Sequence, residues 1–133
     1  MTSIGTVTLD QDMIWENEFA FSPVRGYSEP TLGGGVVYQE YVQSEKGRLI
    51  ILTSSETIGF QKRSTVEALR ALAAELYTSY TLTIQTGATT VTKTVRFCHE
   101  AGDGAVNFRP YVDRGGIHGS GIYYKGTINL MVV

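Results

Sequence analysis

Residues 122–132 read IYYKGTINLMV, and this segment says more about the fold class than any other part of the chain. Alternating apolar and polar residues mark a β-strand with one buried face, because every second side chain points the same way. One face would hold Ile122, Tyr124, Ile128, Leu130 and Val132, and the other Tyr123, Lys125, Thr127 and Asn129. We therefore predict a strand that turns Tyr124 inward and Tyr123 outward.

Further strands are predicted upstream of this segment. Their ranges are 4–9, 36–43, 48–54, 80–86, 90–97 and 105–112. The strands on either side of Gly87 would form a β-hairpin. The uninterrupted apolar run Leu49–Leu52 indicates a strand covered on both faces. Pro110 indicates an edge strand, because proline cannot donate a ladder hydrogen bond.

One amphipathic helix is predicted to begin at Ser64. The sequence Ser64-Thr65-Val66-Glu67 has the spacing of a capping box, in which the first and last side chains accept amide hydrogen bonds at the helix start. Apolar residues then recur at steps of three and four, as on one helix face: Val66, Leu69, Leu72, Ala73 and Leu76. The fifteen glycines and eight tyrosines of the chain, by contrast, favour tight turns and strands. The predicted class is mainly β, a β-sandwich or partly open barrel with one packed α-helix.

Residues 22–35 are predicted to form a long loop. Pro23, Gly26, Pro30 and the run Gly33-Gly34-Gly35 interrupt regular structure. Loops of this length are uncommon inside a compact domain, and they usually carry function or become ordered against a partner. We expect this segment to contact another protein.

Size and charge narrow the class of protein. The 133 residues, 42% of them apolar, fit one domain over residues 1–133. The net charge is −2 and the basic residues are dispersed, so the stripe that binds nucleic acid is not expected. The first residues do not resemble a signal peptide, and no apolar run has the length of a membrane span. With Cys98 as the single cysteine, an intracellular origin without disulfides is predicted.

Catalytic and metal sites are weakly supported by the sequence. Cys98 and His99 are adjacent, and neighbours on a strand point to opposite faces, so a thiol–imidazole pair is not expected. Their spacing to Asp103 matches no zinc pattern. His118 lies among glycines in a segment typical of a connection between strands. We predict no catalytic residue, no bound metal and no cofactor.

A strand-rich domain of this kind is suited to binding other subunits. Tyrosine and tryptophan combine a large apolar area with a polar group, and they are enriched at interfaces. The interface residues predicted on this basis, and from the two glycine-rich segments, are Trp15, Phe19, Gly33, Gly34, Gly35, Arg114, His118 and Tyr123.

Five segments together resemble a known family. They are MIWENEF (13–19), TLGGGVVYQE (31–40), GRLIIL (47–52), VRFCH (95–99) and the closing Tyr123-x-Lys125-x-x-x-x-Leu130. In this order, with the helix and hairpin between them, they are similar to small tail proteins of long-tailed bacteriophages, most nearly to distal tail proteins. The similarity spans nearly the whole chain.

The resemblance implies a structural role in the virion. Distal tail proteins join the tail tube to the baseplate or tail tip as a ring, commonly a hexamer, through loops that engage neighbouring subunits. The expected partners are other copies of the chain, the tube and the tip hub, after assembly in the bacterial host cytoplasm. DNA would pass through the lumen without specific binding, and the mild negative charge agrees with this.

Three alternatives stay open from the sequence. A tail terminator or tail tube subunit would share the same profile. A small carbohydrate-binding module would use exposed tyrosine and tryptophan rings as stacking platforms. An enzyme would require Cys98, His99 and His118 to meet in the folded chain.

Overall fold

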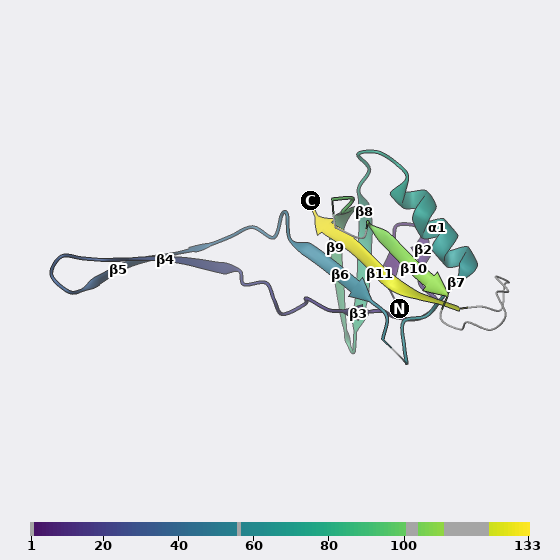
Figure 1. The fold of residues 1–133 in the computed structure, drawn as a ribbon, viewed down its shortest axis with the longest axis horizontal. Coiled ribbons are helices and arrows are strands. Elements are labelled where there is room, and N and C mark those ends of the chain that lie inside the picture. Colours follow the sequence, from purple (N-terminus) through teal and green to yellow (C-terminus); the bar gives the residue numbers. More distant parts are fainter. Residues whose placement is uncertain (1, 56, 101–103, 111–122) are drawn as a thin grey trace.

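A computed structural model describes residues 2–55, 57–100, 104–110 and 123–133. Within these ranges the chain forms a nine-stranded sheet, a separate two-stranded sheet and one helix (Figure 1). The mainly β class with one helix is therefore confirmed. The elements are β1 (Ser3–Ile4), β2 (Val7–Thr8), β3 (Ile14–Trp15), β4 (Val24–Pro30), β5 (Val36–Val42), β6 (Leu49–Thr53), β7 (Gln61–Lys62), α1 (Arg63–Ala73), β8 (Tyr80–Thr86), β9 (Thr89–Phe97), β10 (Val106–Pro110) and β11 (Tyr123–Val132).

Strand β11 is the centre of the nine-stranded sheet. It pairs antiparallel with β6, β7, β9 and β10. Asn129 joins the end of β9 to the start of β10, because its carbonyl accepts a bond from the Cys98 amide and its own amide donates to Ala105. Its buried side chain also donates to the Gly104 carbonyl at 2.9 Å. The predicted strand is present from Tyr123 onward, with Tyr124 buried and Tyr123 exposed at its start, while Asn129 on the opposite face is also buried. Ile122 lies outside the described residues.

The core lies on the inner face of this sheet. Every second side chain of a strand points into this core, as Ile50 and Leu52 do in β6. Leu49 and Ile51, on the other face of β6, are half-buried, so that face is covered only in part. The predicted hairpin is present as β8 and β9, and Pro110 lies in β10, which among the described residues pairs with β11 only. The largest fully buried side chains are Ile4, Ile50, Leu52, Leu69, Leu82, Ile128, Leu130, Gln61, Val95 and Thr2.

Helix α1 packs against the nine-stranded sheet. It contacts β2, at one end of the strand order, as well as β7, β10 and β11. Val66 and Leu69 are its buried apolar residues. The predicted apolar stripe ends early, because the helix stops at Ala73 and Leu76 lies beyond it, exposed to solvent.

The predicted capping box is wrong. Ser64 lies inside the first turn, the N-cap is Lys62, and no side chain of that residue caps the helix. Asp10, from the segment after β2, does this work instead: its Oδ2 accepts bonds from the Lys62 amide at 2.8 Å and from Thr65 Oγ1 at 2.6 Å. Glu67 pairs with Arg63 at 2.9 Å.

The prediction of a long loop over residues 22–35 is also wrong. Residues 24–30 form β4, which pairs along its full length with β5, from Val24 opposite Val42 to Pro30 opposite Val36. Pro30 is tolerated because β4 has a free edge. The two strands form a hairpin that projects away from the body of the molecule (Figure 1).

Candidate subunit interface

The β4–β5 hairpin is exposed along its whole length. Each strand has seven residues, and all of them are exposed. At about 3.3 Å per residue, the paired part is roughly 23 Å long. An isolated two-stranded hairpin is only marginally stable in water. An arm of this length and exposure is therefore expected to pack against another molecule.

Both faces of the hairpin carry apolar side chains. Since paired and alternate residues share a face, Val24, Val36, Tyr38 and Val42 lie on one side. The other side holds Tyr27, Val37 and Tyr41. A hairpin packed on one surface would need only one apolar face. The two-sided pattern favours contacts on both faces.

The tip of the hairpin is a glycine-rich turn that presents Leu32. The Thr31 amide donates to the Gly35 carbonyl at 2.9 Å, and the Gly35 amide donates to Thr31 Oγ1 at 3.1 Å. Gly34 has a φ of 85°, a left-handed conformation that a residue with a Cβ rarely adopts. Leu32 is fully exposed. The predicted residues Gly33, Gly34 and Gly35 thus form the end of the arm.

The root of the hairpin is fixed by polar contacts. The Gln43 amide donates to the Pro23 carbonyl at 2.8 Å, and its side-chain amide donates to the carbonyl of Ser22. Arg25 Nε donates to Gln43 Oε1 at 2.6 Å. These bonds close the hairpin where it leaves the body.

Arg48, just before β6, connects this root to the body. Its guanidinium lies over the rings of Trp15 and Phe21, 4.9 Å and 4.8 Å from the ring centroids. Its Nη2 donates to the Glu18 carbonyl at 2.7 Å, and its Nη1 pairs with Glu45 at 3.1 Å. Its side chain is only 9% exposed. One residue therefore holds the segments that enter and leave the hairpin.

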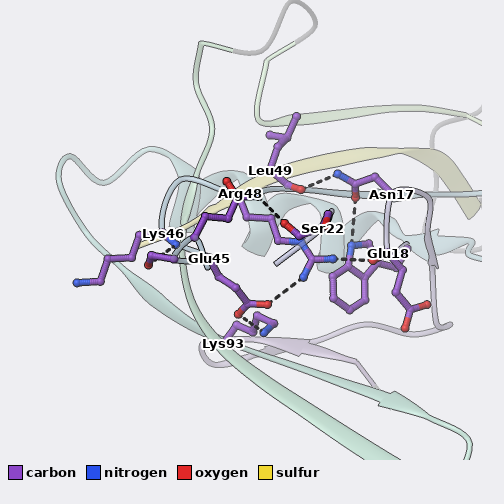
Figure 2. A network of polar contacts seen from close by, with 11 residues as sticks. Asn17, Glu18, Ser22, Glu45, Lys46, Arg48, Leu49 and Lys93 are labelled. Carbon is purple, nitrogen blue, oxygen red and sulfur yellow. Dashed lines mark hydrogen bonds and ion pairs between the residues drawn. The ribbon is translucent and has the colours of Figure 1, made fainter. Parts of the chain in front are cut away.

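Glu45 extends the network to β9. Its second oxygen pairs with Lys93 Nζ at 2.5 Å, so the carboxylate lies between two cations (Figure 2). The hydrogen bond from Lys93, aided by the charge of Arg48, lowers the pKa of Glu45 below its usual value. Asn17 adds a further tie to β6: its Nδ2 donates to the Leu49 carbonyl at 2.6 Å and its Oδ1 accepts the Ile51 amide.

The predicted interface residues fall in several places. Trp15 is half-buried beneath Arg48, with its indole N–H donated to Asn17 Oδ1 at 3.1 Å. Phe19, near the root, is 92% exposed. Tyr123 is 39% exposed where β11 meets β7, far along the chain from the hairpin. The structure brings none of these three to the tip glycines. Arg114 and His118 lie outside the described residues.

A second exposed apolar patch lies at the turn between α1 and β8. Leu76 and Tyr77 project there, and Tyr77 is a non-glycine residue with a φ of 55°. Beside them is a cavity of about 340 Å³, the turn pocket, lined by residues 75–78 and by Arg96, Phe97 and His99. Leu76 was predicted to belong to the buried helix face, so the sequence pattern missed this patch.

Two of the residues weighed for catalysis, Cys98 and His99, follow β9, and the third, His118, lies outside the described residues. Cys98 is a buried free thiol, whereas His99 is exposed at the edge of the turn pocket. Within the described part of the chain, no group of three or more histidine, cysteine or acidic side chains is placed to hold a metal ion.

Comparison with protein-family models, with curated proteins and with solved structures gives no match to this chain. Within the described ranges, no helix combines the length and apolarity required to traverse a bilayer.

Proposed function

We propose that the chain is a structural subunit of a bacteriophage tail, a ring-forming distal tail protein that joins the tube to the tip. The single observation that carries this proposal is the β4–β5 hairpin, an exposed arm with apolar residues on both faces. The order of the sequence segments that resemble distal tail proteins supports it. The protein then works by assembly and not by catalysis.

Exposed apolar area of this extent favours a bound state. Single exposed apolar residues are ordinary, but contiguous ones mark interaction sites. Tyr27, Tyr38 and Tyr41 give the arm the aromatic content that is typical of the buried centre of an interface. A neighbouring subunit covers these side chains in the assembled ring.

A ring also needs two different surfaces on each subunit. Heterologous contacts between unlike surfaces close into a ring when the rotation between subunits allows it. The hairpin and the α1–β8 turn are unlike in shape and lie on different elements, so they meet this requirement. The closed assembly is a hexamer with the tail tube on one side and the tip hub on the other, and DNA passes through its lumen.

Light scattering across a range of protein concentrations tests the proposal. The expected result is a discrete oligomer near the mass of a hexamer, with a central lumen in electron micrographs. Tyr38→Ser/Tyr41→Ser, one substitution on each face of the arm, should give a monomer with unchanged unfolding, because neither residue packs in the core. Thr92→Ser, on the exposed surface of β9, is the matched control.

Three results would contradict the proposal. A monomer at every concentration, also when tube and tip proteins are added, excludes a ring subunit. Long tubes in the micrographs identify a tail tube subunit instead. Binding of glycans that quenches Trp15 fluorescence identifies a carbohydrate-binding module.

A further inference from the structure

The outer half of the hairpin is suited to a small apolar receptor. Between residues 27 and 39 the only charged residue is Glu29. Leu32 is the most exposed apolar side chain of the arm, and the glycines that follow it, Gly33 and Gly34, leave open space around the turn. A protruding leucine on a narrow turn can enter a pocket that a flat sheet face cannot reach.

The turn pocket is such a receptor. Its wall includes Leu76, Tyr77 and Phe97, and its volume of about 340 Å³ is ample for a leucine side chain. Tyr77 has a φ of 55°, a left-handed backbone conformation that is unfavourable for a residue with a Cβ. Strain of this kind persists where the surrounding structure requires it, and it is concentrated at functional sites. The side chain of Tyr77 is fully exposed beside the pocket.

The hairpin cannot reach the turn pocket of its own chain. Figure 1 shows the arm extending from the body on one side, whereas the α1–β8 turn lies on the body itself, beyond the root of the arm. The root is fixed by Arg48 and Gln43, so the arm cannot fold back without breaking these contacts. The tip must therefore meet a pocket on another molecule.

We infer that the hairpin of one copy packs on a second copy and inserts Leu32 into that copy's turn pocket. This inference rests on the proposed function, because it assigns the two unlike surfaces from which the ring is built. Each subunit offers one tip and one pocket, so every copy is both donor and acceptor. The contact is head-to-tail and propagates until the ring closes.

The amount of exposed surface agrees with a partner as large as this chain. A stable interface takes about 20–30 residues from each side. The arm supplies seven exposed residues in each strand as well as the tip, which approaches this range only if the arm is covered along its length. A short peptide in the pocket would leave both strand faces bare.

Mixing two assembly-defective variants tests the inference. Leu32→Asp destroys the tip but keeps the pocket, and Leu76→Asp destroys the pocket but keeps the tip. Each variant alone should be monomeric, whereas an equimolar mixture should form a dimer through its one intact contact and grow no further. Ile58→Asp, which places the same charge on an exposed apolar residue of another loop, should assemble like the wild type.

Cross-linking tests the same contact without relying on ring closure. A mixture of Leu32→Cys and Leu76→Cys should form a disulfide-linked heterodimer, and a mixture of Leu32→Cys and Ile58→Cys should not. The native Cys98 does not interfere because it is buried.

The outcomes separate the inference from the proposed function. Wild-type rings from Leu76→Asp would overturn the inference and leave the ring intact as a proposal. A monomeric mixture of the two aspartate variants, or absence of the cross-link, would also overturn it. A cross-link in a protein that never forms closed rings would support the contact and contradict the ring.

Discussion

The guanidinium of Arg48 lies 4.9 Å from the ring centroid of Trp15, and this contact ties the root of the hairpin to β3. The ring centroid of Phe21 lies 4.8 Å from the same guanidinium. Stacking of this kind is worth about 0.5–1 kcal/mol at exposed sites and about 2 kcal/mol when water is excluded. Because the Arg48 side chain is only 9% exposed, we expect the larger value, about 2 kcal/mol, for this contact.

Arg48→Ala should therefore lower the free energy of unfolding by about 2–3 kcal/mol, because it removes the stacking, the packing and a hydrogen-bonded ion pair. Arg48→Met keeps an apolar chain against the two rings and should lose about half as much. Urea unfolding followed by Trp15 fluorescence measures both. Lys46→Ala, an exposed neighbour, is the control. Equal stability of all three variants would show that the stacking is not stabilising.

Acid should weaken this network and a separate ion pair between Arg96 and Glu100. The hydrogen bond from Lys93 lowers the pKa of Glu45 below its usual 4.5, and the hydrogen bond from Arg96 lowers the pKa of Glu100 to about 2. In the unfolded chain both groups bind protons more readily, so their stabilisation is complete above pH 4.5 and is lost as the pH falls towards 2.

Glu45→Gln should reduce this loss, because it removes one of the two groups. The carboxylate is 42% exposed, so solvent screening limits the effect to less than about 1 kcal/mol. Chemical unfolding at about pH 6 and about pH 3 measures the difference between wild type and variant. A variant with the full acid dependence of the wild type would assign that dependence to other carboxylates.

Helix capping by a distant residue gives a paired prediction. Asp10→Ala should cost about 1–2 kcal/mol, because it removes the acceptor of the Lys62 amide and a negative charge from the helix N-terminus. Ser64→Ala should stay within about 0.5 kcal/mol, since Ser64 caps nothing. Thermal unfolding by circular dichroism distinguishes them. A larger loss of stability for Ser64→Ala than for Asp10→Ala would instead identify Ser64 as the capping residue.

At Gly126 in β11, the neighbouring backbone of β10 leaves no room for a Cβ. A Cβ at this position would lie 1.9 Å from the carbonyl oxygen of Asn107 and 2.7 Å from the Cα of Phe108. Gly126→Ala should lower stability by about 3 kcal/mol or more, because a backbone cannot yield as a side chain does. Gly33→Ala is the control, since its Cβ would meet nothing within 4 Å. Equal melting temperatures of the two variants would refute the close approach.

The longer strands of the body could be predicted because the core imposes a period of two. The single strand predicted over residues 4–9 is wrong, since this segment turns at Gly5 and forms two short antiparallel strands, β1 and β2. Leu82 and Ile84 in β8 are buried where the alternation places them, and so are Leu130 and Val132 in β11. Strand β4 has no buried face, so its sequence does not alternate between apolar and polar residues. Its Gly26 and Pro30 are typical of loops, and the segment was therefore predicted to be one. Its pairing with β5 becomes apparent only from the register of the two strands.

The candidate interface was predictable only in part. The tip glycines stand out as a run in the sequence, and glycine runs favour turns. Leu76 continues the helical period and was assigned to the core, but the helix ends before it. Arg48 has no sequence signal, because its stacking depends on Trp15 and Phe21 being brought together by the fold.

The central place of β11 has a consequence for synthesis on the ribosome. Its partners β6, β7, β9 and β10 all precede it in the chain, so they emerge before the strand that joins them. Until β11 leaves the exit tunnel, β6 and β9 have unpaired edges, which are prone to aggregation. The nine-stranded sheet can therefore close only after β11 has emerged.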